Sequence, residues 1–235
     1  MMKMTANLVP CITKEQFDNI ATDFLTKYCP ESLRSPMRIP IEIIARDKME
    51  LMVEHVNITE DLSTYGQIFF SDGGTEIYKR DTDEIVIVEV KRGTVFIDTD
   101  IFFMRTLGCE RNTLTHECLH WFIHKPYHTL QTLSGSGMAI ACRCPTEQKS
   151  EEKKSLWADE DWMEWQANGI APKILMPKDM FCIKANENEH LKKFTPKDSE
   201  YSHIHLQKAV EDLADFFKVS KQSATIRLKE LGYFT

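Results

Sequence analysis

The segment from Thr115 to Trp121 contains the pattern His-Glu-x-x-His, which restricts more than any other feature how this chain can fold. Residues four positions apart share one face of an α-helix, so a helix would direct His116 and His120 at the same metal ion. Glu117 directly follows the first histidine and can act as general base on a water bound to that metal. Zinc fits such a site because it binds histidine nitrogen and lowers the pKa of bound water towards ~7. The alternative is a surface helix with two exposed histidines.

A catalytic zinc usually takes three protein ligands, so the two histidines leave one ligand to be found. His124 lies on the same helix, but at ~1.5 Å per residue a straight helix places it ~12 Å from His116 along the axis. One ion cannot bind both, so we expect the third ligand to be a carboxylate on a later helix. The candidate is Glu164, an acid among tryptophan and methionine neighbours, which lies at the surface or binds something. The competing acids at 159–161 fall in a first helical turn, where the helix dipole already favours them.

The two motifs together resemble those of the ImmA/IrrE family of metallo-endopeptidases. The matching segments are Thr115-His116-Glu117-x-x-His120-Trp121 and Glu164-Trp165-Gln166-Ala167-Asn168-x-x-Ala171-Pro172-x-x-Leu175-Met176-Pro177. The resemblance implies a zincin-like active site in which His116, His120 and Glu164 bind one zinc ion. It also implies that Glu117 is the catalytic base.

The resemblance covers roughly residues 40 to 235 and carries expectations for the substrate. The segment from Leu213 to Gly232 is similar to the helix-turn-helix-like segment that ends the family's core. Family members cleave transcriptional repressors with helix-turn-helix domains, so the implied function is a zinc-dependent endopeptidase that acts on such a repressor. It would then relieve repression of a mobile element or a stress regulon. The motifs are further apart than in the family, which makes residues 127–155 an insertion that could shape or cover a substrate groove.

Hydrophobic periodicity and turn residues predict an α+β fold with a small, mainly antiparallel sheet. The expected strands lie near residues 51–53, 68–70, 85–90 and 94–97, with turns at 72–74 and 91–93. The first expected helix follows a capping box at 13–16, with Thr13 as cap, and is closed by Pro30. The other expected helices lie from Pro40, at 111–124 with Pro126 as its end, at 156–174, at 204–217, and at 221–231 between a Ser220 cap and Gly232. We divide the chain into an N-terminal helical segment (1–39), a zincin-like core (40–200) and a C-terminal helix-turn-helix-like segment (201–235).

Other reactive side chains lie near the motif without a fixed geometry. We assign no oxyanion-stabilising residue among His124, Tyr127 and His128. For the two histidines we favour a surface helix end, where a cationic ring suits the helix dipole. Cys142 and Cys144 form the closest cysteine pair, and we interpret them as small residues in an extended segment because no second pair completes a zinc site. The seven scattered cysteines do not have the pattern of a disulfide framework.

The charge balance narrows the function classes. The chain has 29 Lys and Arg against 36 Asp and Glu, a net charge of −7, which disfavours a dedicated nucleic-acid binder. No apolar run approaches the ~18 residues that span a membrane, and the N-terminus lacks a secretory signal, so we expect a cytoplasmic protein. The alternative function is a non-catalytic regulator that binds protein or DNA through C-terminal helices carrying Lys218, Lys221, Arg227 and Lys229. Manganese or iron could replace zinc, because such sites discriminate metals imperfectly.

Overall fold

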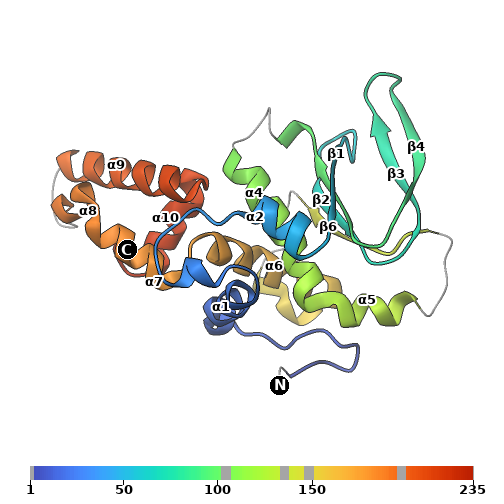
Figure 1. Cartoon of the computed structure of the whole chain (residues 1–235), viewed down its shortest axis with the longest axis horizontal. Coiled ribbons are helices and arrows are strands. Elements are labelled where there is room, and N and C mark those ends of the chain that lie inside the picture. The colour runs from blue at the N-terminus through green and yellow to red at the C-terminus, as the bar shows by residue number, and fades with distance from the viewer. Residues whose placement is uncertain (1–2, 102–106, 133–137, 146–150, 195–199, 235) are drawn as a thin grey trace.

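The computed structural model describes residues 3–101, 107–132, 138–145, 151–194 and 200–234, which form a mixed α+β architecture as predicted (Figure 1). The α-helices are α1 (Phe17–Tyr28), α2 (Ile41–Ile43), α4 (Leu107–Leu119), α5 (Lys125–Thr132), α6 (Asp159–Leu175), α7 (Lys178–Glu187), α8 (Glu189–Lys193), α9 (Glu200–Phe217) and α10 (Lys221–Glu230). The 3-10 helices are η1 (Lys14–Gln16), η2 (Pro30–Leu33) and η5 (Glu151–Leu156), and the π-helices are η3 (Ile44–Lys48) and η4 (His120–His124). The strands are β1 (Met52–Val56), β2 (Thr64–Phe69), β3 (Gly73–Lys79), β4 (Glu84–Val90), β5 (Thr94–Asp98) and β6 (Ala141–Pro145).

A four-stranded sheet with the order β1-β5-β2-β6 supports the long helix that carries the histidine motif. β1 pairs with β5 in parallel, whereas β5 with β2 and β2 with β6 are antiparallel, so the prediction of a small, mainly antiparallel sheet is confirmed. All five residues of β5 are buried, because this strand lies inside the sheet and α4 packs against it. β6 comes from the predicted insertion and forms one edge of the sheet.

A second, two-stranded sheet consists of the β3–β4 hairpin, which extends away from the helices (Figure 1). The turn predicted at 72–74 is wrong: residues 73 and 74 begin β3, and the turn joining the two strands lies at 80–83. Gly73 has a φ of +152°, and a Cβ atom there would lie 2.7 Å from the backbone nitrogen of Ala139. The glycine therefore serves a close approach of two chain segments rather than a hairpin turn.

The helix with the histidine motif does not end at Pro126, as predicted from its missing N–H group. α4, η4 and α5 follow one another without a break and continue the helix to Thr132. Proline lacks the N–H that would bond to the carbonyl four residues earlier. The π-helical turn lies just before this proline and widens the helix there, which accommodates the interruption of the hydrogen-bond ladder.

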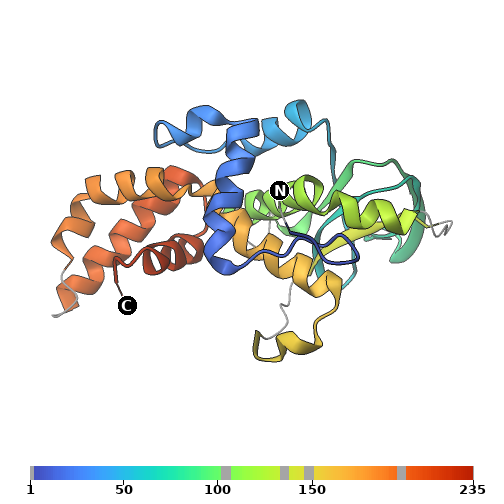
Figure 2. The same cartoon turned by 90° about the horizontal axis from the view of Figure 1, so that it is seen from below.

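Three parts of the chain share one buried hydrophobic cluster. Its members include Phe24 of α1, Val95 of β5, Leu119 of α4, Ile170 of α6 and Phe217 of α9. Figure 2 shows α1 running across the molecule between the C-terminal helices and the α4–α5 helix. This shared cluster holds α4 and α6 side by side, which positions the two motifs.

The C-terminal helices end the molecule on the side opposite the β3–β4 hairpin (Figure 1). The predicted cap is confirmed, since the Ser220 hydroxyl accepts a hydrogen bond of 3.0 Å from the Ser223 nitrogen. Gly232 follows α10 with a φ of +79°, the left-handed conformation expected at a helix C-terminus. The sequence did not reveal α7 and α8. Among the described residues, no helix combines the length and apolar composition needed to cross a membrane.

Candidate metal centre

Three side chains from two helices converge at the buried centre of the molecule. The Nε2 atoms of His116 and His120 lie 2.9 Å apart on the α4–η4 helix. Glu164 on α6 places Oε2 3.1 Å from Nε2 of His116 and Oε1 3.3 Å from Nε2 of His120. Both histidine side chains are 0% exposed, and that of Glu164 is 18% exposed. The structure thus brings together the three residues named as ligands from the sequence.

These distances suit a tetrahedral divalent cation. At Zn–N and Zn–O distances of about 2.0 Å, two ligand atoms of one zinc lie about 3.3 Å apart. Burial opposes the charged form of Glu164, but the two histidines outweigh it and hold the pKa of this carboxyl well below its usual range. Burial also lowers the pKa of His120, which favours the neutral ring that a metal ligand requires. Apart from its 3.1 Å ion pair with His116 Nε2, Glu164 Oε2 has no hydrogen-bond partner among the described residues, which suits an oxygen that binds a metal.

A chain of hydrogen bonds orients His120. The Gln166 Nε2 group donates to the carbonyl of Pro10 at 2.7 Å, which turns Gln166 Oε1 towards His124 Nε2 at 3.0 Å. His124 Nε2 must therefore donate, and His124 Nδ1 accepts from His120 Nδ1 at 2.8 Å. The remaining lone pair of His120 is on Nε2, the atom that faces His116 and Glu164. The chain thus selects the tautomer and ring orientation that a metal needs.

The interpretation of His124 and His128 as a surface helix end is wrong, because α5 continues the helix past both. His124 is fully buried, and its Nε2 is bonded to Gln166 rather than directed at the candidate ligands. His128 is 3% exposed and stacks on Phe70 with ring centroids 3.9 Å apart. Tyr127 donates its hydroxyl hydrogen bond to Glu160, in the first turn of α6. The structure therefore gives the two histidines internal roles.

Glu117 lies beside the three candidate ligands and is fully buried. Neither of its carboxylate oxygens has a hydrogen-bond partner among the described residues. Burial raises the pKa of Glu117, and the negative charge of Glu164 raises it further. Gly66 of β2 makes room for this side chain, since a Cβ atom there would lie 2.8 Å from Glu117 Oε1 and 2.6 Å from Thr113 Cγ2. The sequence alone gave no reason to single out this glycine.

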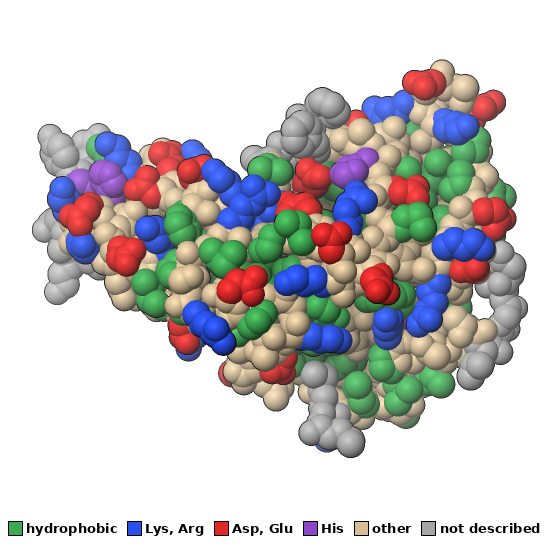
Figure 3. Space-filling model, in the orientation of Figure 1, with side chains coloured by type: hydrophobic (Ala, Val, Ile, Leu, Met, Phe, Trp, Pro, Cys, Tyr) green, Lys and Arg blue, Asp and Glu red, His purple; other side chains and the backbone are tan. Residues whose placement is uncertain are grey.

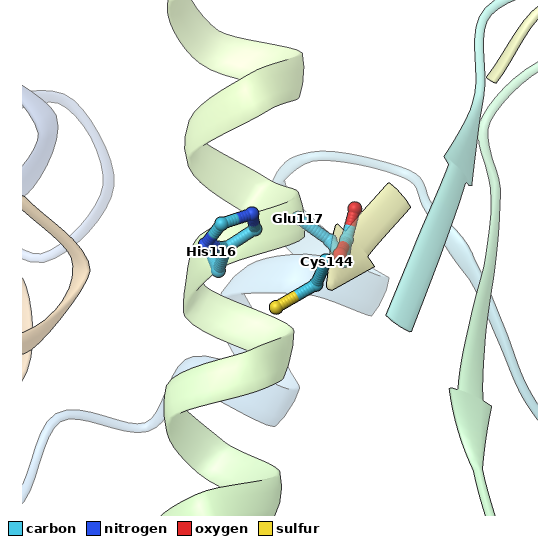
Figure 4. A group of neighbouring side chains, drawn as sticks. All are labelled: His116, Glu117 and Cys144. Atoms are coloured by element: carbon cyan, nitrogen blue, oxygen red, sulfur yellow. The ribbon is translucent and has the colours of Figure 1, made fainter. Parts of the chain in front are cut away.

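Two cysteines of β6 complete the surroundings of the site. Cys144 forms a second group with His116 and Glu117, in which one possible ligand atom of each lies within 4.8 Å of the others (Figure 4). The Cys142 thiol donates a hydrogen bond of 3.2 Å to Glu164 Oε1 and lies 3.7 Å from His120 Nε2. The extended segment is confirmed, and Cys142 in addition contacts two candidate ligands. The sequence offered one indication that both cysteines face the same side: side chains alternate along a strand, so positions 142 and 144 share one face.

Three of the four basic residues considered for DNA contact pair with acids. Arg227 is 2% exposed and pairs with Asp18 of α1 and Glu230. Lys218 pairs with Asp215, and Lys221 pairs with Glu211 at 2.7 Å. Figure 3 shows Lys and Arg interspersed with Asp and Glu over the visible face of the molecule.

The chain matches no protein-family model and no curated protein. The candidate metal centre and the two motifs therefore carry the inference of function.

Proposed function

We propose that this protein is a zinc-dependent endopeptidase with a zincin-like core, related to the ImmA/IrrE family. The observation that supports it most is the convergence of His116 Nε2, His120 Nε2 and the Glu164 carboxylate within 3.3 Å of one another. Two imidazoles and one carboxylate are the ligand set of zinc peptidases. Glu117, one residue beyond the first histidine, stands next to this set.

The residues of the site have distinct roles in peptide-bond hydrolysis. A bound zinc would polarise the scissile carbonyl and lower the pKa of a coordinated water. Glu117 takes a proton from the attacking water and delivers it to the leaving amine nitrogen. Its burial suits this role, because a carboxyl with a raised pKa is a stronger base than an exposed one. His124 and Gln166 hold the ring of His120 in the orientation described above.

The substrate class in this proposal is a transcriptional repressor with a helix-turn-helix domain, which the protein would cleave in the cytoplasm. The motif resemblance supports this class. The buried pairing of Arg227 with Asp18 of α1 favours packing of α10 on the core over contact of this side chain with DNA. A regulator that binds a repressor without cutting it is the competing outcome, and the experiment below separates the two.

The test measures zinc content and peptide cleavage in the same preparations. We expect about one zinc per wild-type chain and cleavage of peptides from a proteome-derived library, read by mass spectrometry. Glu117→Gln should retain the zinc but cleave about 10²- to 10⁴-fold more slowly, the usual contribution of a general base. Glu110→Gln changes an acid of the same helix that pairs with His55, and it should leave both values unchanged. Equal cleavage by wild type and Glu117→Gln would contradict the role of Glu117, and cleavage by neither would favour the binding protein.

A further inference from the structure

The pairing of β6 with β2 fixes how its cysteines face the site. Cys142 lies opposite Ile68, and Cys144 lies opposite Gly66, the glycine that makes room for Glu117. Because side chains alternate along a strand, both cysteines are on the same face of the sheet. That face packs against α4, the helix of the histidine motif. The register of one edge strand therefore sets two buried thiols against the candidate metal centre.

The two thiols differ in what they contact. Cys142 Sγ lies 3.2 Å from Glu164 Oε1 and 3.7 Å from His120 Nε2, so it touches two of the three candidate ligands. It stands outside the group of His116, His120 and Glu164, whose ligand atoms all lie within 4.8 Å of one another. Cys144 Sγ is instead grouped with His116 and the base Glu117. With Zn–S at about 2.3 Å and Zn–N at about 2.0 Å, the sulfur and nitrogen ligands of a tetrahedral zinc lie about 3.5 Å apart. The two distances from Cys142 Sγ, 3.2 Å to Glu164 Oε1 and 3.7 Å to His120 Nε2, lie on either side of 3.5 Å.

The burial of the site is a second observation. His116, Glu117 and His120 are fully buried and Glu164 is only 18% exposed, although hydrolysis requires a substrate to reach the metal and the base. A catalytic zinc site keeps one position open, whereas a site with four protein ligands is closed. β6 is an edge strand, so its departure would leave the pairing among β1, β5 and β2 intact.

We propose that Cys142 is the fourth protein ligand of this metal, and that β6 caps the site in the closed state described here. This inference rests on the metal centre of the proposed function. On binding, the Cys142 thiol loses its proton to solvent, and a sulfur lone pair takes the fourth position in place of water. Opening would separate β6 from β2, return a proton from solvent to the Cys142 sulfur and let water take its position, which would expose the base and the metal to a peptide.

Cobalt(II) reports the ligands directly, because tetrahedral cobalt gives visible d–d bands and a bound thiolate adds a near-ultraviolet charge-transfer band. We expect both features when the wild-type chain is titrated with cobalt(II). Cys142→Ser should lose the charge-transfer band and keep the visible bands. Cys144→Ser, the matched control on the same strand, should have the wild-type spectrum.

The outcomes separate this inference from the proposed function. Visible bands without a charge-transfer band in the wild type would overturn the role of Cys142 and leave the metal centre standing. Loss of the charge-transfer band in Cys144→Ser rather than Cys142→Ser would also overturn it and favour the group with His116 and Glu117. No cobalt binding by the wild type would refute the metal centre itself.

If Cys142→Ser does not fold, the ligands can be identified in the wild-type chain alone. X-ray absorption of the zinc-loaded wild-type chain should show one sulfur at about 2.3 Å beside nitrogen and oxygen ligands at about 2.0 Å. A zinc shell with nitrogen and oxygen alone would overturn the proposal.

Discussion

Two regions of this molecule bury polar side chains, and they satisfy them in different ways. Along α4, η4 and α5, His116, Glu117 and His128 each have a buried nitrogen or oxygen atom without a partner among the described residues. In the C-terminal region, Arg227 is equally buried, yet its guanidinium pairs with Asp18 and donates to the carbonyl of Met176. Buried polar groups are almost always bonded, so the exceptions require an explanation.

The difference separates packing from function. A charge whose partners all belong to the chain, such as Arg227, stabilises the fold and offers nothing to a ligand. Carboxylate oxygens that lack a hydrogen-bond partner beside converging imidazoles, as at Glu117 and Glu164, indicate a group that the chain binds. The three predictions below test this division, each with one change in one region.

The largest effect is expected from the paired region. Asp18→Ala leaves the buried Arg227 guanidinium without its α1 partner, so the free energy of unfolding should fall by about 1–3 kcal/mol. Zinc affinity should not change, because the pair lies outside the candidate ligand set. Urea unfolding and chelator competition measure the two quantities. Asp23 is an exposed aspartate of the same helix, so the control Asp23→Ala should alter neither the stability nor the zinc affinity. A fall in zinc affinity with Asp18→Ala would show that the two regions are not independent.

The second effect concerns the orientation of His120. His124→Phe removes the acceptor of the His120 Nδ1 hydrogen and leaves Gln166 Oε1 unbonded. Loss of such an outer partner typically weakens metal binding about 10- to 100-fold. Competition with a chelator of known affinity measures the change. His190→Phe removes a histidine–histidine contact of 3.1 Å in α8, away from the site, and should leave zinc affinity unchanged. Unaltered affinity in His124→Phe would mean that the hydrogen-bond chain does not position the ligand.

The smallest effect is a pH dependence of stability. Burial lowers the pKa of His128 to about 3, and both ring nitrogens lack a partner among the described residues. Below the ordinary pKa of about 6.5, the unfolded chain binds a proton that the folded chain does not, so stability falls with pH by up to about 1.4 kcal/mol per unit.

His128→Phe should remove this contribution, because phenylalanine preserves the stacking on Phe70 and cannot titrate. Between pH 6.5 and 5.5 the variant should lose about 1 kcal/mol less stability than the wild type, by urea unfolding with a chelator present. The exposed His203 supplies the control His203→Gln, which should retain the wild-type slope. An unchanged slope in His128→Phe would show that His128 is protonated or exposed in the folded chain.

Local sequence patterns predicted much of the fold. The presence of α1, the cap and end of α10 and most strands follow from periodicity, capping residues and glycine, which act over a few neighbours. The first turn after Thr13 is a 3-10 helix and α1 begins at Phe17. The histidine spacing placed His116 and His120 on one helical face, and the second motif named Glu164. The predictions at Pro126 and Gly73 failed because the surrounding structure overrode a local preference. At Pro126 a π-helical turn lets the helix continue, and at Gly73 the glycine permits a close approach of two chain segments instead of a turn.

The sequence by itself determined the kind of ligand atoms available, the helical spacing of the histidines and the presence of an acid beside the first of them. Only the tertiary structure decided which distant segments surround these atoms. Cys142 faces His120 and Glu164 because of the strand register between β6 and β2, and Gln166 reaches His124 because α6 packs on the α4–η4 helix. Such contacts depend on the packing of elements far apart in the chain, which no short-range pattern encodes.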